Sequence, residues 1–248
     1  QVLISPKISV TYLGFNFRYP LLKHHDIREA IALGINRSEI LQYRLQNLGI
    51  LANGIFSKEC PFYNKNIPDV KYDPKKAKDL IAKSKIQHPE FSLAVSSLNR
   101  STVEIAKAIA NNLKQIGISI TLHTLENTIF TDRINKGSMQ LWIANWVGFK
   151  DPDHLRFIFS SNMIPPHGRN RGAYSNGHVD KLLAQGREEF DMAKRKVIYD
   201  KAQEIIYKDY PYVNLWHSLN TVVLANNIKG YKPYADGRYW SIVEVTKQ

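Results

Sequence analysis

The chain has 248 residues, of which 44% are hydrophobic and 23% charged; these proportions are ordinary for a globular protein and exclude a collagen-like or disordered chain. The net charge of +12 leaves nucleic acid, a membrane surface or an acidic ligand open as partners. No RNA-recognition or zinc-finger pattern accompanies that charge, no apolar run approaches the ~20 residues of a membrane span, and the single cysteine, Cys60, excludes an internal disulfide.

The first elements are a strand and two helices. Alternating apolar residues predict a strand over residues 8–17. Asp26 is placed to cap a helix with an apolar face between residues 27 and 35. A second helix is expected over residues 38–48, with Gly49 ending it.

A long loop is expected next, over residues 49–72, because this stretch is rich in proline and asparagine. Asp73-Pro74 then opens a helix, since aspartate is a good N-cap and proline is tolerated in the first turn. That helix is expected to end near Ser84.

The clearest unit is a strand, a helix and a second strand. Residues 91–97 read as a strand, Ser101 and Glu104 as a capping box, and residues 118–122 as a strand after Gly117. This order predicts a right-handed parallel crossover. The residues of the helix that share one apolar face are Val103, Ala106, Ile109, Ala110, Leu113 and Ile116.

The rest of the chain continues to alternate helices with strands, so the fold class is α/β. Asp151-Pro152 is expected to start a short helix, and the last twenty residues are expected to be irregular. The remaining predicted helices span residues 128–136, 179–189 and 192–209, and the remaining predicted strands span residues 139–147, 213–217 and 221–225.

No catalytic motif is present. The nucleophile elbow, the phosphate-binding loop, the dinucleotide fingerprint and the HExxH zinc motif are all missing, so we expect no enzyme. His24-His25-Asp26 is a weak metal candidate, because adjacent residues point in different directions on a helix or strand. We therefore expect no metal site and no cofactor.

Three loops carry residues suited to binding a ligand. Trp146 and Phe149 follow a strand, and Arg100 lies between another strand and a helix, where parallel α/β sheets usually hold ligands. Arginine can bind both oxygens of a carboxylate. Each residue also has a structural reading, as core aromatic or solvated arginine. The third loop contributes Asn170, Arg171, Tyr174 and Asn176.

Several segments together resemble solute-binding protein family five, the dipeptide, oligopeptide and nickel-binding proteins of ABC importers. Their order and spacing match over about residues 9–235. The matching segments are Tyr12-Leu13-Gly14-Phe15-Asn16, Tyr72-Asp73-Pro74, Gly117-Ile118, Trp146 with Asp151-Pro152-Asp153, Tyr174-Ser175-Asn176 and Lys229-Gly230-Tyr231.

The resemblance implies a periplasmic-binding-protein-like architecture with two lobes joined by crossing strands. Family members are about twice as long as this chain. Residues 16–218 would be the second lobe, with a mixed sheet flanked by helices. Residues 1–15 and 219–248 would be crossing strands and pieces of the first lobe. We expect that the N-terminal half and its signal peptide lie outside this sequence.

One position departs from the family pattern. The strand end after the matching tryptophan often carries an aspartate that pairs with a peptide's α-amino group, whereas here it holds Phe149 followed by Lys150. Asp151 could substitute, although the pattern gives it a capping role. Arg100 resembles the residue that holds a ligand carboxylate in dipeptide binders.

These expectations combine into a clamp that captures peptides for the permease subunits of an importer. Trp146 and Phe149 would wall the ligand, and Arg100 and Arg171 would meet negative charge. Nickel chelates, haem or opine-like compounds are alternative ligands, and a basic nucleic-acid-binding module is a remote alternative. We expect a periplasmic or envelope-associated monomer that binds no nucleic acid. The residues that would shape the cleft are Asn170, Tyr174 and Asn176.

Overall fold

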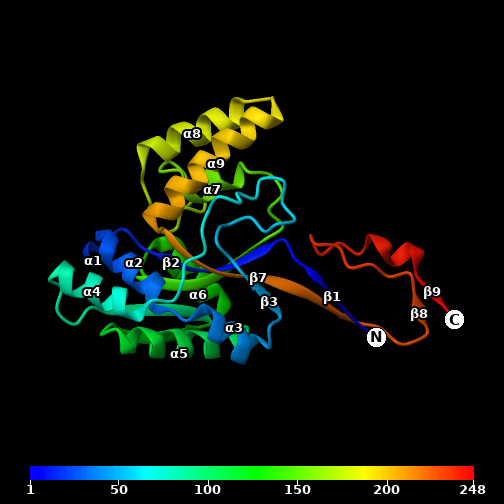
Figure 1. Ribbon diagram of the computed structural model, residues 1–248, viewed down its shortest axis with the longest axis horizontal. Coiled ribbons are helices and arrows are strands. Elements are labelled where there is room, and N and C mark those ends of the chain that lie inside the picture. Colours follow the sequence, from blue (N-terminus) through cyan, green and yellow to red (C-terminus); the bar gives the residue numbers. More distant parts are fainter.

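A mixed sheet forms the centre of the molecule (Figure 1). The computed structural model describes residues 1–248. The strands run in the order β1-β7-β2-β6-β4-β5, with β3 also paired to β7. Their bounds are β1 Val2–Pro6, β2 Ser9–Phe15, β3 Gly49–Leu51, β4 Glu90–Ser96, β5 Ser119–Leu125, β6 Leu141–Val147 and β7 Tyr212–Val223.

The parallel part of the sheet is the predicted crossover. β4 pairs in parallel with β5 and with β6, and β2 runs antiparallel to both β6 and β7. The helix between β4 and β5, α5, spans Arg100–Gln115. The predicted capping box is wrong: Asn99 is the N-cap, and its side chain accepts from the amide of Ser101. Asparagine caps as well as serine, and it starts the helix earlier.

Two apolar clusters cover the two faces of the sheet. One packs β2, β4 and β6 against α2 to α5, and the other packs the same strands against α6 to α9. In β2, Leu13 and Phe15 face the first cluster, whereas Val10 and Tyr12 face the second. The helices span α1 Pro20–Lys23, α2 His25–Gly34, α3 Arg37–Leu45, α4 Pro74–Ser84, α6 Asn127–Lys136, α7 His154–Phe159, α8 Gly177–Glu188 and α9 Met192–Asp209.

Helix ends follow local hydrogen bonding, and two predicted starts are wrong. Asp73 caps α4 as expected, accepting from the amide of Lys76. Asp26 does not cap α2, because the helix begins one residue earlier and Asp26 lies inside its first turn. α3 begins at Arg37 after the cap Asn36 and ends at Leu45, so the predicted span of 38–48 is shifted and too long.

The secondary structure of β7, β3 and the C-terminal residues differs most from the sequence-based prediction. Residues 212–223 form one continuous strand, not two, because β1 pairs with its polar second half. Gly49 begins β3 where a helix end was predicted. The C-terminal residues are partly ordered, as β8 Ile228–Lys229, a short 3-10 helix Trp240–Glu244 and β9 Thr246–Lys247.

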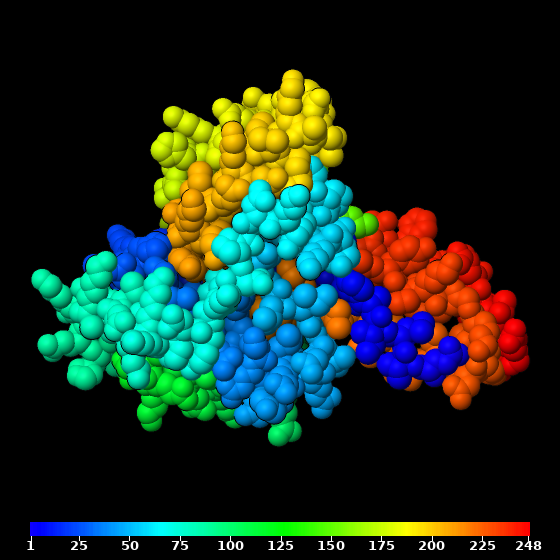
Figure 2. All heavy atoms as spheres, viewed as in Figure 1, coloured from blue at the N-terminus to red at the C-terminus, as the bar shows by residue number.

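The C-terminal segment lies beside the main body of the molecule (Figures 1 and 2) and is joined to it near the start of β2, where the Ile8 amide donates to the Ala235 carbonyl. β1 and β7 leave the sheet together as a two-stranded ribbon, and the red C-terminal residues protrude beyond it. None of the helices combines the length and the apolar character that a membrane crossing requires.

Candidate ligand-binding site

Trp146, Phe149 and Arg100 lie at one end of the strands of the sheet, whereas Tyr174 and Asn176 bond to Asp209 at the other end, beside Arg28 of α2. Because β4, β5 and β6 are parallel, their carboxyl ends meet at the same end of the sheet. Trp146 lies at the end of β6, Phe149 just beyond it, and Arg100 at the start of the helix that follows β4. This is where open α/β sheets bind ligands.

An aromatic group forms around Trp146. Its ring stacks on Tyr12, with centroids 5.9 Å apart and planes 9° from parallel. Phe149 lies 5.4 Å from Trp146 and 4.5 Å from His154, centroid to centroid. The guanidinium carbon of Arg171 lies 5.0 Å from the Trp146 ring centroid. The structure thus brings together three predicted site residues and adds Tyr12, which lies 134 positions before Trp146 and was predicted only as part of a strand and of a family-like segment.

Arg171 is held in a fixed orientation without a carboxylate partner. Its Nε donates to Asn135 Oδ1 over 2.9 Å, and its Nη1 donates to the Tyr12 hydroxyl over 3.4 Å. The side chain forms none of the ion pairs in the molecule and is half-buried. Its positive charge therefore stays available to a ligand anion beside Trp146.

Asn170 and Asn176 use their polar atoms inside the protein. The buried Asn170 amide donates to the carbonyl oxygens of Ser160 and Tyr174, and its Oδ1 accepts from the Tyr174 amide. Asn176 caps α8, where its Oδ1 accepts from the His178 amide. Both residues fix the course of the loop, and direct contact between them and a ligand stays a prediction.

Tyr174 ties the same loop to the end of α9. Its hydroxyl donates to Asp209 Oδ2, which also accepts from Asn176 Nδ2 over 2.8 Å. Burial and the Asp209 carboxylate raise the pKa of Tyr174 well above its ordinary value, so it stays protonated. Burial lowers the pKa of the neighbouring Arg28 to about 10, with Asp209 acting in the opposite direction.

Arg100 stands apart from this group. It is exposed, and it makes no hydrogen bond or ion pair with any other predicted site residue. Its place at the α5 N-terminus, beyond β4, still puts it at the same end of the sheet as Trp146. Its role toward a ligand carboxylate stays a prediction.

The last residues of β6 have a strand neighbour on one side only. β4 pairs with β6 at Leu141 and Trp142 and then diverges, whereas β2 stays paired with β6 as far as Val147. Residues 144–147 therefore have an unpaired edge, and the Val147 side chain is 54% exposed. Such an edge can accept an added strand.

Phe149, which the resemblance predicts to stand where relatives carry an amine-binding aspartate, is a buried aromatic residue. Phe149 is only 6% exposed. Lys150 Nζ lies 2.5 Å from Asp236 Oδ2, and Asp151 pairs with Arg195 over 3.1 Å. Arg195 and a backbone amide lower the pKa of Asp151 against the effect of burial. Lys150 carries the wrong charge to bind an amino group, and Asp151 could bind one only by giving up Arg195.

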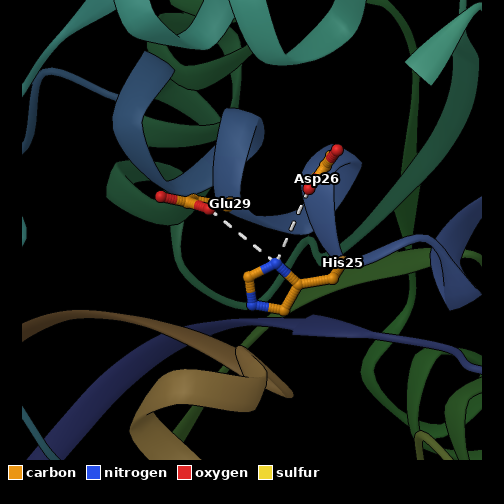
Figure 3. Close-up of side chains that lie close together, drawn as sticks. All are labelled: His25, Asp26 and Glu29. Atoms are coloured by element: carbon orange, nitrogen blue, oxygen red, sulfur yellow. Dashed lines mark ion pairs between the residues drawn. The ribbon is translucent and has the colours of Figure 1, made fainter. Parts of the chain in front are cut away.

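Figure 3 shows a cluster at the start of α2, which follows the carboxyl end of β2 and so lies at the opposite end of the strands from Trp146. His25 Nδ1 points between Asp26 and Glu29, at 3.9 Å and 3.7 Å from their oxygens. Asp26 and Glu29 face Lys83 and Lys76, at 3.9 Å and 2.7 Å. These lysines supply the positive charge that a metal ion would bring, so the cluster is an ion-pair network between α2 and α4. His24 takes no part in it.

Comparison with known proteins gives consistent relatives. A di/tripeptide-binding protein of Pseudomonas aeruginosa, named as probable, is 25% identical over 239 residues, covering 94% of this chain and 45% of that protein. Heme-binding protein A of Haemophilus influenzae is 25% identical over 239 residues, covering 93% and 43%. The chain therefore spans about half the length of the curated relatives it matches.

A solved structure agrees in fold. The binding protein DppA of Helicobacter pylori, in complex with the peptide STSA, superposes with a TM-score of 0.86 at 25% identity, covering 99% of this chain and 49% of that one. This similarity confirms the predicted fold: the chain folds like the periplasmic binding proteins of the peptide-binding class. Residues 1–162 match the family model for the middle part of these proteins. The chain belongs to the bacterial extracellular solute-binding proteins, family 5.

Proposed function

We propose that this chain is part of the substrate-binding component of an ABC importer, which captures peptides and delivers them to the membrane permease. The observation that carries the proposal is the unpaired edge of residues 144–147, beside Trp146 and Arg171. A peptide that adds to this edge as a strand is held through its backbone, so its side chains can vary. The di/tripeptide-binding relative supports this ligand class.

The charges at the edge favour an acidic end of the ligand. Arg171 is oriented and has no anionic partner, and Arg100 is exposed at a helix N-terminus. Both positions suit a carboxylate. With Phe149 at the position of the aspartate, we infer that this lobe recognises the carboxylate and backbone of a peptide more than its amino group.

We propose that residues 16–218 form one lobe and that ligand is enclosed when a second lobe closes over it. The ribbon of β1 and β7 and the protruding C-terminal segment would belong to the crossing strands and the first lobe. Exposed apolar side chains along these parts support the proposal, because they need a partner surface. They include Val2, Ile4, Val223, Trp240 and Val243.

The ligand class can be tested with the full-length protein, including its first lobe. We would purify it without added ligand and record native mass spectra. Heterogeneous extra mass in peptide-sized steps is expected. A single discrete adduct of haem size, or a metal chelate, would contradict the peptide proposal; the haem-binding relative makes this the second candidate.

We further propose that the full-length protein acts as a periplasmic or envelope-associated monomer, without enzymatic activity and without a nucleic-acid partner. The family of solute-binding proteins supports this reading. Sedimentation should give one monomeric species. Turnover of a bound peptide, or an affinity for random DNA that falls steeply with salt, would contradict it.

A further inference from the structure

Three charged side chains meet where the loop after β6 touches the C-terminal segment. Lys150, in the loop, donates from Nζ to Asp236 Oδ2, and Nε of Arg238 lies 3.1 Å from the same oxygen. None of the three forms an ion pair with any other residue. Two cations thus share one anion, so this charged triad keeps an excess of positive charge.

Backbone hydrogen bonds fix the two segments that carry the triad. The Ile8 carbonyl oxygen accepts from the Gly148 amide over 2.8 Å, and the Ile8 amide donates to the Ala235 carbonyl oxygen over 2.7 Å. One residue just before β2 therefore joins the chain near Lys150 to the chain next to Asp236. The triad has a fixed place in the fold.

The cations of the triad keep hydrogen-bond donors that a ligand can reach. An ammonium group has three N–H donors, and Lys150 Nζ makes only the one hydrogen bond to Asp236. The Lys150 side chain is 52% exposed and that of Arg238 is 58% exposed, whereas the Asp236 side chain is 10% exposed. A ligand therefore meets the two cations much more readily than the carboxylate between them.

The triad adjoins the aromatic group of the proposed binding site. Lys150 directly follows Phe149, whose ring centroid lies 5.4 Å from that of Trp146. The next residue, Asp151, is paired with Arg195 over 3.1 Å, so it does not offset the charge of Lys150. The charge beyond the end of β6 is thus positive, next to rings that would contact the ligand.

We propose that Lys150, assisted by Arg238, sets the ligand specificity of this site by favouring peptides with an acidic side chain. The inference rests on the proposed capture of peptides between two lobes: Lys150 belongs to one lobe, and Asp236 and Arg238 lie in the segment proposed for the other. The glutamate or aspartate carboxylate of the peptide accepts from the free N–H groups of Lys150, while Asp236 holds this lysine in place. A basic peptide side chain meets like charge here.

The test is a calorimetric titration of the full-length protein with matched tripeptides. Three peptides carry one glutamate among alanines, at the first, second or third position, and each has a counterpart with glutamine at that position. For at least one position, the glutamate peptide should bind about fivefold more tightly, as expected for a partly exposed ion pair. This preference should shrink as salt is added, because salt screens exposed charges.

The Lys150→Gln variant assigns the preference to one side chain. It should lose most of the preference for glutamate, while the glutamine peptides bind as before. Lys107→Gln is the matched control and should keep the preference, because Lys107 is a similarly exposed lysine paired with one carboxylate, Glu104, on α5.

The outcomes separate this inference from the proposed function. Equal binding of the glutamate and glutamine peptides at every position overturns the inference and leaves peptide capture in place. A preference unchanged in Lys150→Gln, or an equal weakening of both kinds of peptide in this variant, also overturns it. If none of the six peptides binds, peptide capture itself fails, and the inference fails with it.

Discussion

Asn170, Tyr174 and Asn176 of the loop of residues 170–176 differ in hydrogen bonding from the last residues of β6, 144–147, and from Arg171, which lies over Trp146. In the loop, Asn170, Tyr174 and Asn176 spend their polar atoms on the protein itself. At the edge, the backbone after Trp142 lacks a second strand, and Arg171 lacks an anion. The predicted site residues thus fall into two kinds: those whose polar atoms are bonded within the protein, and those that keep an unpaired charge or backbone edge.

The comparison leads to a clear division of effects. Changes in groups that are fully bonded should reduce the free energy of unfolding, since they leave buried partners unpaired. Changes in groups that have an unpaired charge or an unpaired backbone edge should mainly reduce ligand affinity, with a smaller effect on stability. The predictions below test this division.

The largest effect is expected for Asn170→Ala. It removes three hydrogen bonds and leaves the Tyr174 amide and the Tyr174 carbonyl without the partner that Asn170 supplies, whereas the Ser160 carbonyl keeps the Met163 amide, so the free energy of unfolding should fall by about 3 kcal/mol. Urea unfolding followed by circular dichroism measures this. Ser175→Ala, exposed in the same loop, is the control and should change little. Equal stability of the two variants would mean that the loop is not held by Asn170.

Arg171→Ala should show the opposite behaviour. In the full-length protein we expect peptide affinity to fall about thirtyfold, because a half-buried charge-assisted bond contributes roughly 2 kcal/mol. Calorimetric titration with a peptide would measure it. Arg169→Ala is a matched control, since this arginine lies in the same loop but over Phe157 and not over Trp146. Similar losses in both variants would show a general charge effect.

The Arg100→Ala variant tests whether the binding site extends as far as the start of α5. Because Arg100 is exposed, we expect a smaller loss of about tenfold for a ligand with a free carboxylate. An amidated peptide should not distinguish the variant from the unchanged protein. Unchanged affinity for both peptides would remove Arg100 from the binding site.

The smallest effect concerns acid stability. Burial lowers the pKa of His217, so below the ordinary value of 6.5 the unfolded chain takes up a proton that the folded protein resists. This contribution to stability is complete above pH 6.5 and is lost as the pH falls through the folded pKa. The free energy of unfolding of His217→Gln should therefore decrease less between pH 7.5 and pH 5 than that of the unchanged protein. His167→Gln, at an exposed histidine, should not differ from the unchanged protein.

Local signals predicted much of the fold. The parallel crossover of β4, α5 and β5 follows from periodicity alone, and the Asp73 cap was predicted correctly. Sequence patterns could not predict β7 as one continuous strand. Its second half is held in the strand by pairing with β1, a segment more than 200 residues away in the chain. Asp26 is a separate case: its helix begins at His25, after an N-cap residue, His24, that makes no side-chain capping bond.

The site was predicted less completely than the fold. Strand ends led to the prediction of Trp146 and Phe149, and loop composition led to that of Arg171; the structure places the three side chains together, and their contact with a ligand stays a prediction. The internal bonding of Asn170 and Tyr174 was hidden, because its partners, Ser160 and Asp209, are identified only by the folded chain. Nor could any pattern indicate that residues 144–147 lack a neighbour, which depends on where β4 diverges from β6.

The unpaired end of β6 also has a consequence for solubility. A strand edge that accepts the backbone of any peptide accepts an extended segment of another copy of the same chain just as well. Exposed Val147 adds an apolar contact to such pairing. Ligand, or a closing lobe, would cover this edge, so a protein stored without either is expected to aggregate from this end of the sheet first.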